Sequence, residues 1–140
     1  MPDTPPPPAH PRQLVSSGTI WEERVGFSRA VRVGNQVFVS GTTATDDAGH
    51  LVGPGDPEAQ ARYTIAKIGR ALAEAGATLA DVVRTRVYVA RAADWEAVGR
   101  AHAHAFGAIR PANTLVEVSA LVGDGYLVEI DADAIVASAG

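Results

Sequence analysis

Residues 110–136 read RPANTLVEVSALVGDGYLVEIDADAIV, and this stretch decides the fold because it holds two strand patterns in succession. Two strands are predicted, over about residues 113–119 and 126–135, where valine, isoleucine and other apolar residues are frequent. The glycines between the two runs favour a loop. The sequence therefore predicts that the chain ends in two β-strands.

A helix is predicted immediately before these strands, where Asp94 is a plausible N-cap and Gly107 ends the pattern. Its apolar stripe consists of Trp95, Val98, His102, Ala105 and Phe106. We expect His102 to be partly buried with a hydrogen-bond partner and His104 to face solvent. The two histidines are two residues apart, so they point to different faces of the helix and do not form a metal-binding pair.

The run DVVRTRVYV at residues 81–89 predicts another strand, because its side chains alternate in character with a period of two. One face is predicted to carry Val83, Thr85, Val87 and Val89. The other face carries Arg84, Arg86 and Tyr88 and is polar.

A longer helix is predicted over residues 57–75, with Asp56 as the N-cap and Pro57 in the first turn. Its apolar face repeats at spacings of three and four residues, through Ala61, Ile65, Ile68, Leu72 and Ala75. Gly76 follows, where a helix commonly ends in the left-handed conformation.

Residues 30–40 read AVRVGNQVFVS and predict an antiparallel hairpin, in which Gly34 supplies the positive φ that a type II′ turn requires. The glycine-rich and aspartate-rich residues 41–56 are predicted to form a loop. Residues 1–12 hold six of the nine prolines and are predicted to be a disordered leader. Residues 13–140 then form a single domain of α+β class, with helices covering a mixed sheet.

The composition excludes several classes of function. The formal net charge of −4 provides no excess of cations for phosphates, which argues against binding to nucleic acid. The chain has no cysteine, so disulfides and thiolate metal sites are excluded, and the sequence indicates neither a metal nor a cofactor. No signal peptide or membrane-spanning run is present, and a cytoplasmic location is the default expectation.

Three motifs in order resemble one known family. They are VSGTT at residues 39–43, AGA-x-x-x-DVV-x-T-x-VYV at residues 75–89, and RPANTLVEV with YLVEIDADAI in the final stretch. Together they resemble the Rid family of reactive intermediate deaminases, also called the YjgF or endoribonuclease L-PSP family. The resemblance implies a chorismate-mutase-like fold, with a mixed six-stranded sheet and two helices on one face. It also implies a homotrimer with small-molecule pockets between subunits.

In active family members an arginine after a proline-alanine pair binds the carboxylate of an imine or enamine. Asn113 occupies that position here, and it is neutral. By the same resemblance, three further pocket positions differ from the common residues: Phe27 replaces tyrosine, Gly99 replaces asparagine, and Leu115 replaces cysteine. Ser40 and Glu129 are retained, and Gly41 is also expected to line the pocket.

The resemblance assigns Glu129 to positioning or activating the attacking water, and burial would raise its pKa as that role requires. The alternative is an acid in an interface salt bridge. Ser40 either contacts the ligand or bonds to backbone. Arg29 is our preferred replacement for the missing arginine, ahead of Arg84, Arg86 and Arg110, each of which has a surface salt bridge as its alternative role.

Three functions remain after the sequence has been considered. The first is an imine or enamine hydrolase, that is a deaminase, with altered substrate specificity. The second is a trimeric protein that binds a small molecule, such as an imine, enamine or carboxylate, without turnover. The third and weakest is an endoribonuclease, because the chain is acidic and has no histidine or lysine catalytic cluster.

Overall fold

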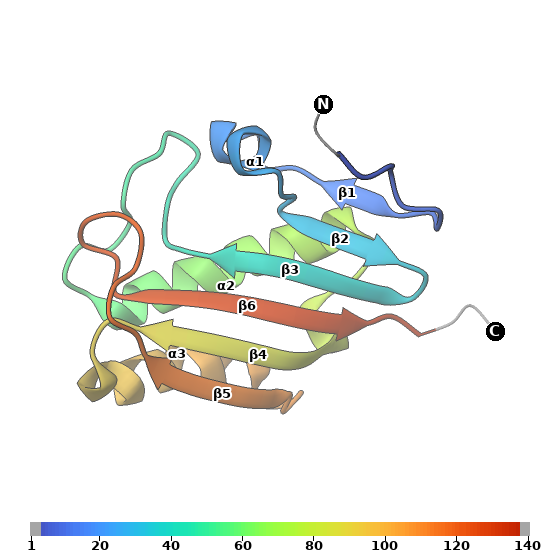
Figure 1. Cartoon of the computed structure of the whole chain (residues 1–140). Helices are drawn as coiled ribbons and strands as arrows, with labels where there is room; N and C mark the ends of the chain where they lie inside the picture. The colour runs from blue at the N-terminus through green and yellow to red at the C-terminus, as the bar shows by residue number, and fades with distance from the viewer. Residues whose placement is uncertain (1–3, 138–140) are drawn as a thin grey trace.

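The computed structural model describes residues 4–137, so the first three residues of the predicted leader lie outside the described residues. Figure 1 shows a sheet with two long helices behind it. The strands are β1 (Gln13–Val15), β2 (Ala30–Val33), β3 (Gln36–Thr42), β4 (Val82–Val89), β5 (Ala112–Glu117) and β6 (Val128–Ile135). The helices are α1 (Ile20–Val25), α2 (Pro57–Glu74) and α3 (Trp95–Phe106), with 3-10 turns η1 (Leu79–Asp81) and η2 (Ala92–Asp94).

The six strands are arranged in the order β1-β2-β3-β6-β4-β5. The pair β4 and β5 is parallel, because the chain crosses through α3 between them, and every other pair is antiparallel. The last strand, β6, lies between β3 and β4 in the middle of the sheet (Figure 1). The mixed six-stranded sheet that the family resemblance implies is therefore confirmed.

One face of the sheet is covered by α2 and α3, which pack against each other and bury the core. The side chains of strand β6 alternate between the two faces of the sheet. Val128, Ile130 and Ala132 are fully buried beneath the helices. The acids that alternate with them, including Glu129 and Asp131, must point to the opposite face, which no helix among residues 4–137 covers. We call this the open face.

The predicted hairpin and the predicted long helix are confirmed. The hairpin pairs Val33 with Gln36 across a two-residue turn, and Gly34 has a φ of 61°. In α2 the Asp56 carboxylate accepts a hydrogen bond of 3.0 Å from the backbone N–H of Ala59, as an N-cap does. No helix or strand was predicted between the leader and the hairpin, and the structure has β1 and the short α1 there. Residues 4–12 form no helix or strand, and the disorder of the leader stays a prediction.

The predicted buried face of β4 is wrong at its first residue. Val83 is 44% exposed, whereas Val82 is 3% exposed and belongs to the core. The pairing with β6 shifts between Val82 and Arg84, so one extra residue breaks the period of two. From Thr85 onward the expected alternation holds.

The start of α3 also differs from the prediction. Trp95 is 58% exposed and is not part of the buried stripe. The Asp94 side chain makes no capping hydrogen bond, and it instead accepts one of 2.9 Å from Arg91. An arginine three residues away therefore competes for the carboxylate that the backbone would otherwise use. Val98 and Phe106 are buried as predicted, and His104 is exposed.

Gln60 of α2 forms hydrogen bonds to two loops, the one before α2 and the one before β6. Its side chain is fully buried, and its amide nitrogen donates to the carbonyls of Gly53 and Gly125 at 3.2 and 3.0 Å. Its amide oxygen accepts from the backbone N–H of Leu127 at 2.8 Å. These bonds hold the segment that leads directly into β6.

We expect Gln60→Leu to lower the free energy of unfolding by about 2 to 4 kcal/mol, because it leaves buried backbone groups without partners. Urea unfolding followed by circular dichroism measures the change. Gln36→Ala is the control, since Gln36 is exposed at the end of the hairpin. Equal stability of the two variants would contradict the role of Gln60.

No helix among residues 4–137 has the length and apolar character needed to cross a membrane.

Candidate functional site

Glu129 lies near the start of β6 on the open face, beside the irregular end of β3. The pairing of β3 with β6 shifts between Val39 and Thr42, so Ser40 and Gly41 lie in a bulge across from Asp131. The Gly41 backbone is next to the Glu129 carboxylate. A Cβ atom on Gly41 would collide with Oε2 of Glu129. Glycine is therefore required for the carboxylate to lie against the β3 backbone.

Glu129 is half-buried, and burial raises the pKa of its carboxyl above its usual range. The positive charge of Arg29 opposes this rise in pKa, whereas the neighbouring carboxylate of Asp131 adds to it. A carboxyl with a raised pKa exchanges protons more readily near neutral pH. Glu129 consequently has the electrostatic properties of a general acid or base.

Arg29 is held close to this acid by the bulge. Its guanidinium donates a hydrogen bond of 2.6 Å to the carbonyl of Gly41, and the Arg29 carbonyl accepts from the N–H of Ser40 at 3.0 Å. The guanidinium lies 5.8 Å from the centre of the Phe27 ring, which is within the range of a cation–π contact. Burial lowers the pKa of Arg29, and the charges of Glu22 and Glu129 oppose that effect.

The Ser40 hydroxyl donates to the carbonyl of Ser28 at 2.7 Å. This is the backbone-bonding role considered for Ser40, and it fixes the segment before β2 that carries Arg29. In one chain the structure thus brings together five of the eight predicted site residues: Phe27, Arg29, Ser40, Gly41 and Glu129.

Asn113 lies on the other side of the sheet. Its amide nitrogen donates to Oγ1 of Thr85 at 2.9 Å, and that hydroxyl is 2.8 Å from Nε2 of His102 on α3. Because Thr85 is fully buried under the helices, Asn113 also points to the helix side. His102 therefore has the hydrogen-bond partner that was expected, and burial lowers its pKa.

Leu115 follows Asn113 by two residues, shares its side of β5 and packs against the core. Gly99 lies in α3, and a Cβ atom there would meet open space. The sheet therefore separates Asn113, Leu115 and Gly99 from Glu129 within a single chain. Their shared pocket stays a prediction.

The other candidate cations are engaged or remote. Arg86 forms ion pairs of 3.0 Å with Asp131 and 3.3 Å with Asp133 on the open face, as its alternative role predicted. Arg110 donates to the carbonyl of Gly107 at 3.1 Å. Arg29 is the candidate whose charge acts on Glu129.

Residues 21–136 match the model of the family described as Endoribonuclease L-PSP, which is another name for the Rid family. The chain belongs to the Rid family. Protein SCO2049 of Streptomyces coelicolor is 42% identical over 86% of this chain and 89% of its own length. The 3-aminoacrylate deaminase RutC of Acinetobacter baylyi is 35% identical over 72% of this chain and 79% of its own length.

A solved structure supports the same assignment. Rv2704 of Mycobacterium tuberculosis, a member of the YjgF/YER057c/UK114 family, is 52% identical and superposes with a TM-score of 0.83. The match covers 90% of this chain and all of that one. The Rid fold expected from the three motifs is therefore confirmed.

Sequence reasoning missed one feature near Arg29. Lys67 on α2 is the only lysine of the chain, and its ammonium group donates to the carbonyl of Thr43 at 2.9 Å. From the sequence alone, a lysine next to the apolar face of a helix is expected to point to solvent. The one sequence feature that could have drawn attention to Lys67 is that the chain has no other lysine.

We expect the pKa of Glu129 to lie above that of an exposed glutamate and to rise further in Arg29→Met, because the variant removes the opposing positive charge. The chemical shift of the Glu129 side-chain carboxyl carbon, followed by NMR against pH, measures both values. Arg84→Met is the control, since Arg84 is exposed on β4. A Glu129 pKa unchanged in Arg29→Met would show that Arg29 does not act on this acid.

Proposed function

We propose that this Rid protein is an imine or enamine deaminase, a hydrolase whose substrate differs from that of family members with the usual arginine. The observation that carries the proposal is the half-buried Glu129, which lies against the Gly41 backbone with a raised pKa and with Arg29 close by. The similarity to RutC, whose name is 3-aminoacrylate deaminase, supports the same class of reaction.

The proposed reaction adds water across a C=N bond. Glu129 accepts a proton from the attacking water while the oxygen forms a bond to the imine carbon and the C=N electrons pass to nitrogen. Glu129 returns this proton to the nitrogen, which gives a neutral carbinolamine. The hydroxyl proton of the carbinolamine then passes through Glu129 to the same nitrogen, the C–N bond breaks, and the products are a carbonyl compound and ammonia. An enamine enters the same sequence after it has tautomerised to the imine.

Arg29 takes the role of substrate anchor in this proposal. Guanidinium binds carboxylates through paired hydrogen bonds, which neutral Asn113 cannot reproduce. Arg29 lies close enough to Glu129 for its charge to act on that acid, whereas the family arginine position is on β5. A substrate held from this different direction would have a different shape from the usual small carboxylate, and that difference is the basis of the altered specificity.

A homotrimer with pockets between subunits completes the proposal. Within one chain, Glu129 and Asn113 point to opposite sides of the sheet. Asn113 lies on the edge strand β5, where a neighbouring subunit can approach it. We propose that the Glu129 group of one subunit faces the Asn113 group of another, so that each pocket uses residues of two chains.

Light scattering coupled to size-exclusion chromatography tests this assembly. We expect a mass about three times that of the 14.5 kDa chain. A mass near that of one chain would rule out pockets between subunits.

A non-catalytic trimer that binds a small molecule is the second candidate. It is favoured by Asn113, which is neutral and has its amide nitrogen engaged by Thr85. Under this alternative the pocket would hold a ligand without releasing ammonia.

The deaminase proposal predicts that the purified protein accelerates ammonia release from imines generated in the assay from several amino acids. Glu129→Gln should lower the rate at least a hundredfold, because general acid–base groups contribute about 10² to 10⁴. Coupled detection of ammonia and of the keto acid gives the rate.

Glu96→Gln provides a matched control, because it makes the same change at an exposed position in the first turn of α3. Full activity in Glu129→Gln would remove this acid from the mechanism. Ligand binding without ammonia release from any imine would favour the second candidate.

A further inference from the structure

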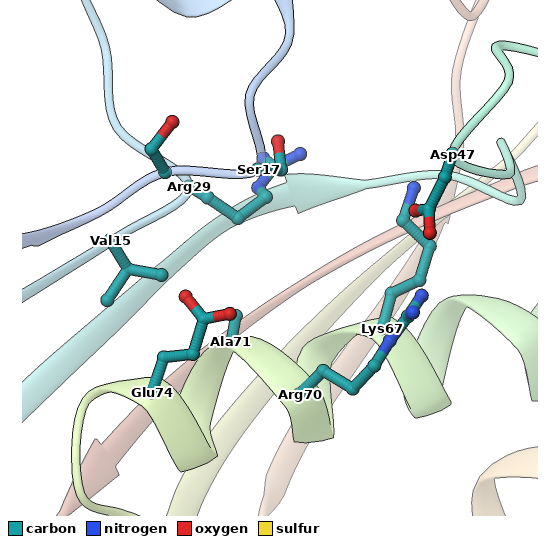
Figure 2. A pocket seen from close by; sticks show the side chains of 9 residues that line it. Val15, Ser17, Arg29, Asp47, Lys67, Arg70, Ala71 and Glu74 are labelled. Atoms are coloured by element: carbon teal, nitrogen blue, oxygen red, sulfur yellow. The ribbon is translucent and has the colours of Figure 1, made fainter.

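A cleft of about 240 Å³ lies between the N-terminal segment and helix α2. It is smaller than the roughly 300 to 1,000 Å³ of pockets for drug-sized ligands, so it suits a small metabolite. Figure 2 shows Arg29 on one side of it and Lys67 and Arg70 rising from α2. Its full lining is Val15, Ser16, Ser17, Arg29, Asp47, Lys67, Arg70, Ala71 and Glu74.

The three cations of this cleft lack a carboxylate partner. Within residues 4–137, none of Arg29, Lys67 and Arg70 forms an ion pair, although Arg62 and Arg100 on the neighbouring surfaces both bind Glu58. Asp47 and Glu74 also line the cleft, but neither contacts a cation closely enough for an ion pair in that part of the chain. The three positive charges therefore line the cleft without a carboxylate from residues 4–137 in contact with any of them.

Lys67 shows the effect of this convergence. Burial lowers the pKa of its ammonium group, and the like charges of Arg29 and Arg70 lower it further, whereas the carboxylates of Asp47 and Asp46 oppose this change. Its hydrogen bond to the Thr43 carbonyl leaves two of the three ammonium protons for another acceptor. Repulsion among three cations is relieved when an anion binds between them.

The guanidinium of Arg29 is incompletely hydrogen-bonded. Its Nε atom is buried and has no hydrogen-bond partner among residues 4–137, even though one terminal nitrogen donates to Gly41. A buried donor without an acceptor costs free energy, and a bound water or ion is one way in which such a donor is satisfied. An oxyanion is the acceptor that fits a guanidinium.

We propose that this cleft, between Arg29, Lys67 and Arg70, binds a small molecule through a carboxylate or phosphate group. This site goes beyond the proposed deaminase function. It lies within one chain, on the helix side of the sheet, and it shares only Arg29 with the Glu129 group.

The unique lysine makes the site directly observable. In protein labelled with ¹³C and ¹⁵N, a single Cε–Nζ correlation reports on Lys67. Inorganic phosphate and succinate are added in separate titrations, with chloride keeping the ionic strength constant. We expect a saturable shift of this signal and a rise in the pKa of Lys67, because a bound anion favours the charged ammonium. The tighter of the two probes identifies the group that the cleft prefers.

Arg70→Gln is the test variant, because Arg70 is exposed and its loss leaves the core intact. It should weaken binding about tenfold while Lys67 remains as the reporter. Arg62→Gln is the matched control, since it removes the same charge from the same helix outside the cleft. A shift that does not saturate, or affinity that falls equally in both variants, would overturn the proposal.

The result of the phosphate and succinate titrations can be distinguished from the result of the deaminase assay. Glu129→Gln should bind the probe at least as well as the unaltered protein, whether or not that protein releases ammonia. Loss of probe binding in Glu129→Gln would overturn the placement of the anion in this cleft.

Discussion

The alternation along β6 is the constraint on which the rest of this structure depends. This strand lies in the middle of the sheet, so its apolar side chains have to meet α2 and α3 while its acids have to meet the open face. A slip of one residue would bury Glu129 and Asp131 beneath the helices. The packing of the core and the position of the candidate acid are therefore set by the same pairing register.

The acids of β6 differ in what surrounds them. Asp131 accepts from both Arg86 and Tyr88, and Asp133 pairs with the same arginine. Glu129 lies beyond this network, next to a glycine and a more distant guanidinium. Two carboxylates thus have hydrogen-bonded or ion-paired partners, whereas burial raises the pKa of the third, Glu129. The difference arises from neighbours on β3 and β4, because the strand itself repeats the same pattern.

Much of the fold could be predicted from local sequence, since the hairpin around Gly34 and the helix after Asp56 each contain their own turn or cap. Val82 could not be predicted as the buried residue, because a bulge depends on the partner strand. Glu129 and Asn113 were assigned by family resemblance, and nothing local indicated that the sheet separates them. Lys67 was missed because its importance comes from Arg29, which is remote in sequence.

Arg29 has a consequence for how the two proposed sites would communicate. Its guanidinium interacts electrostatically with Glu129 and also lines the cleft beside Lys67. An anion in the cleft would compensate that charge and so make Glu129 hold its proton more tightly. By thermodynamic reciprocity, ionised Glu129 would weaken the anion's binding to the same degree. One side chain would therefore allow the supply of a metabolite to adjust the acidity of a catalytic group on the far side of the strand.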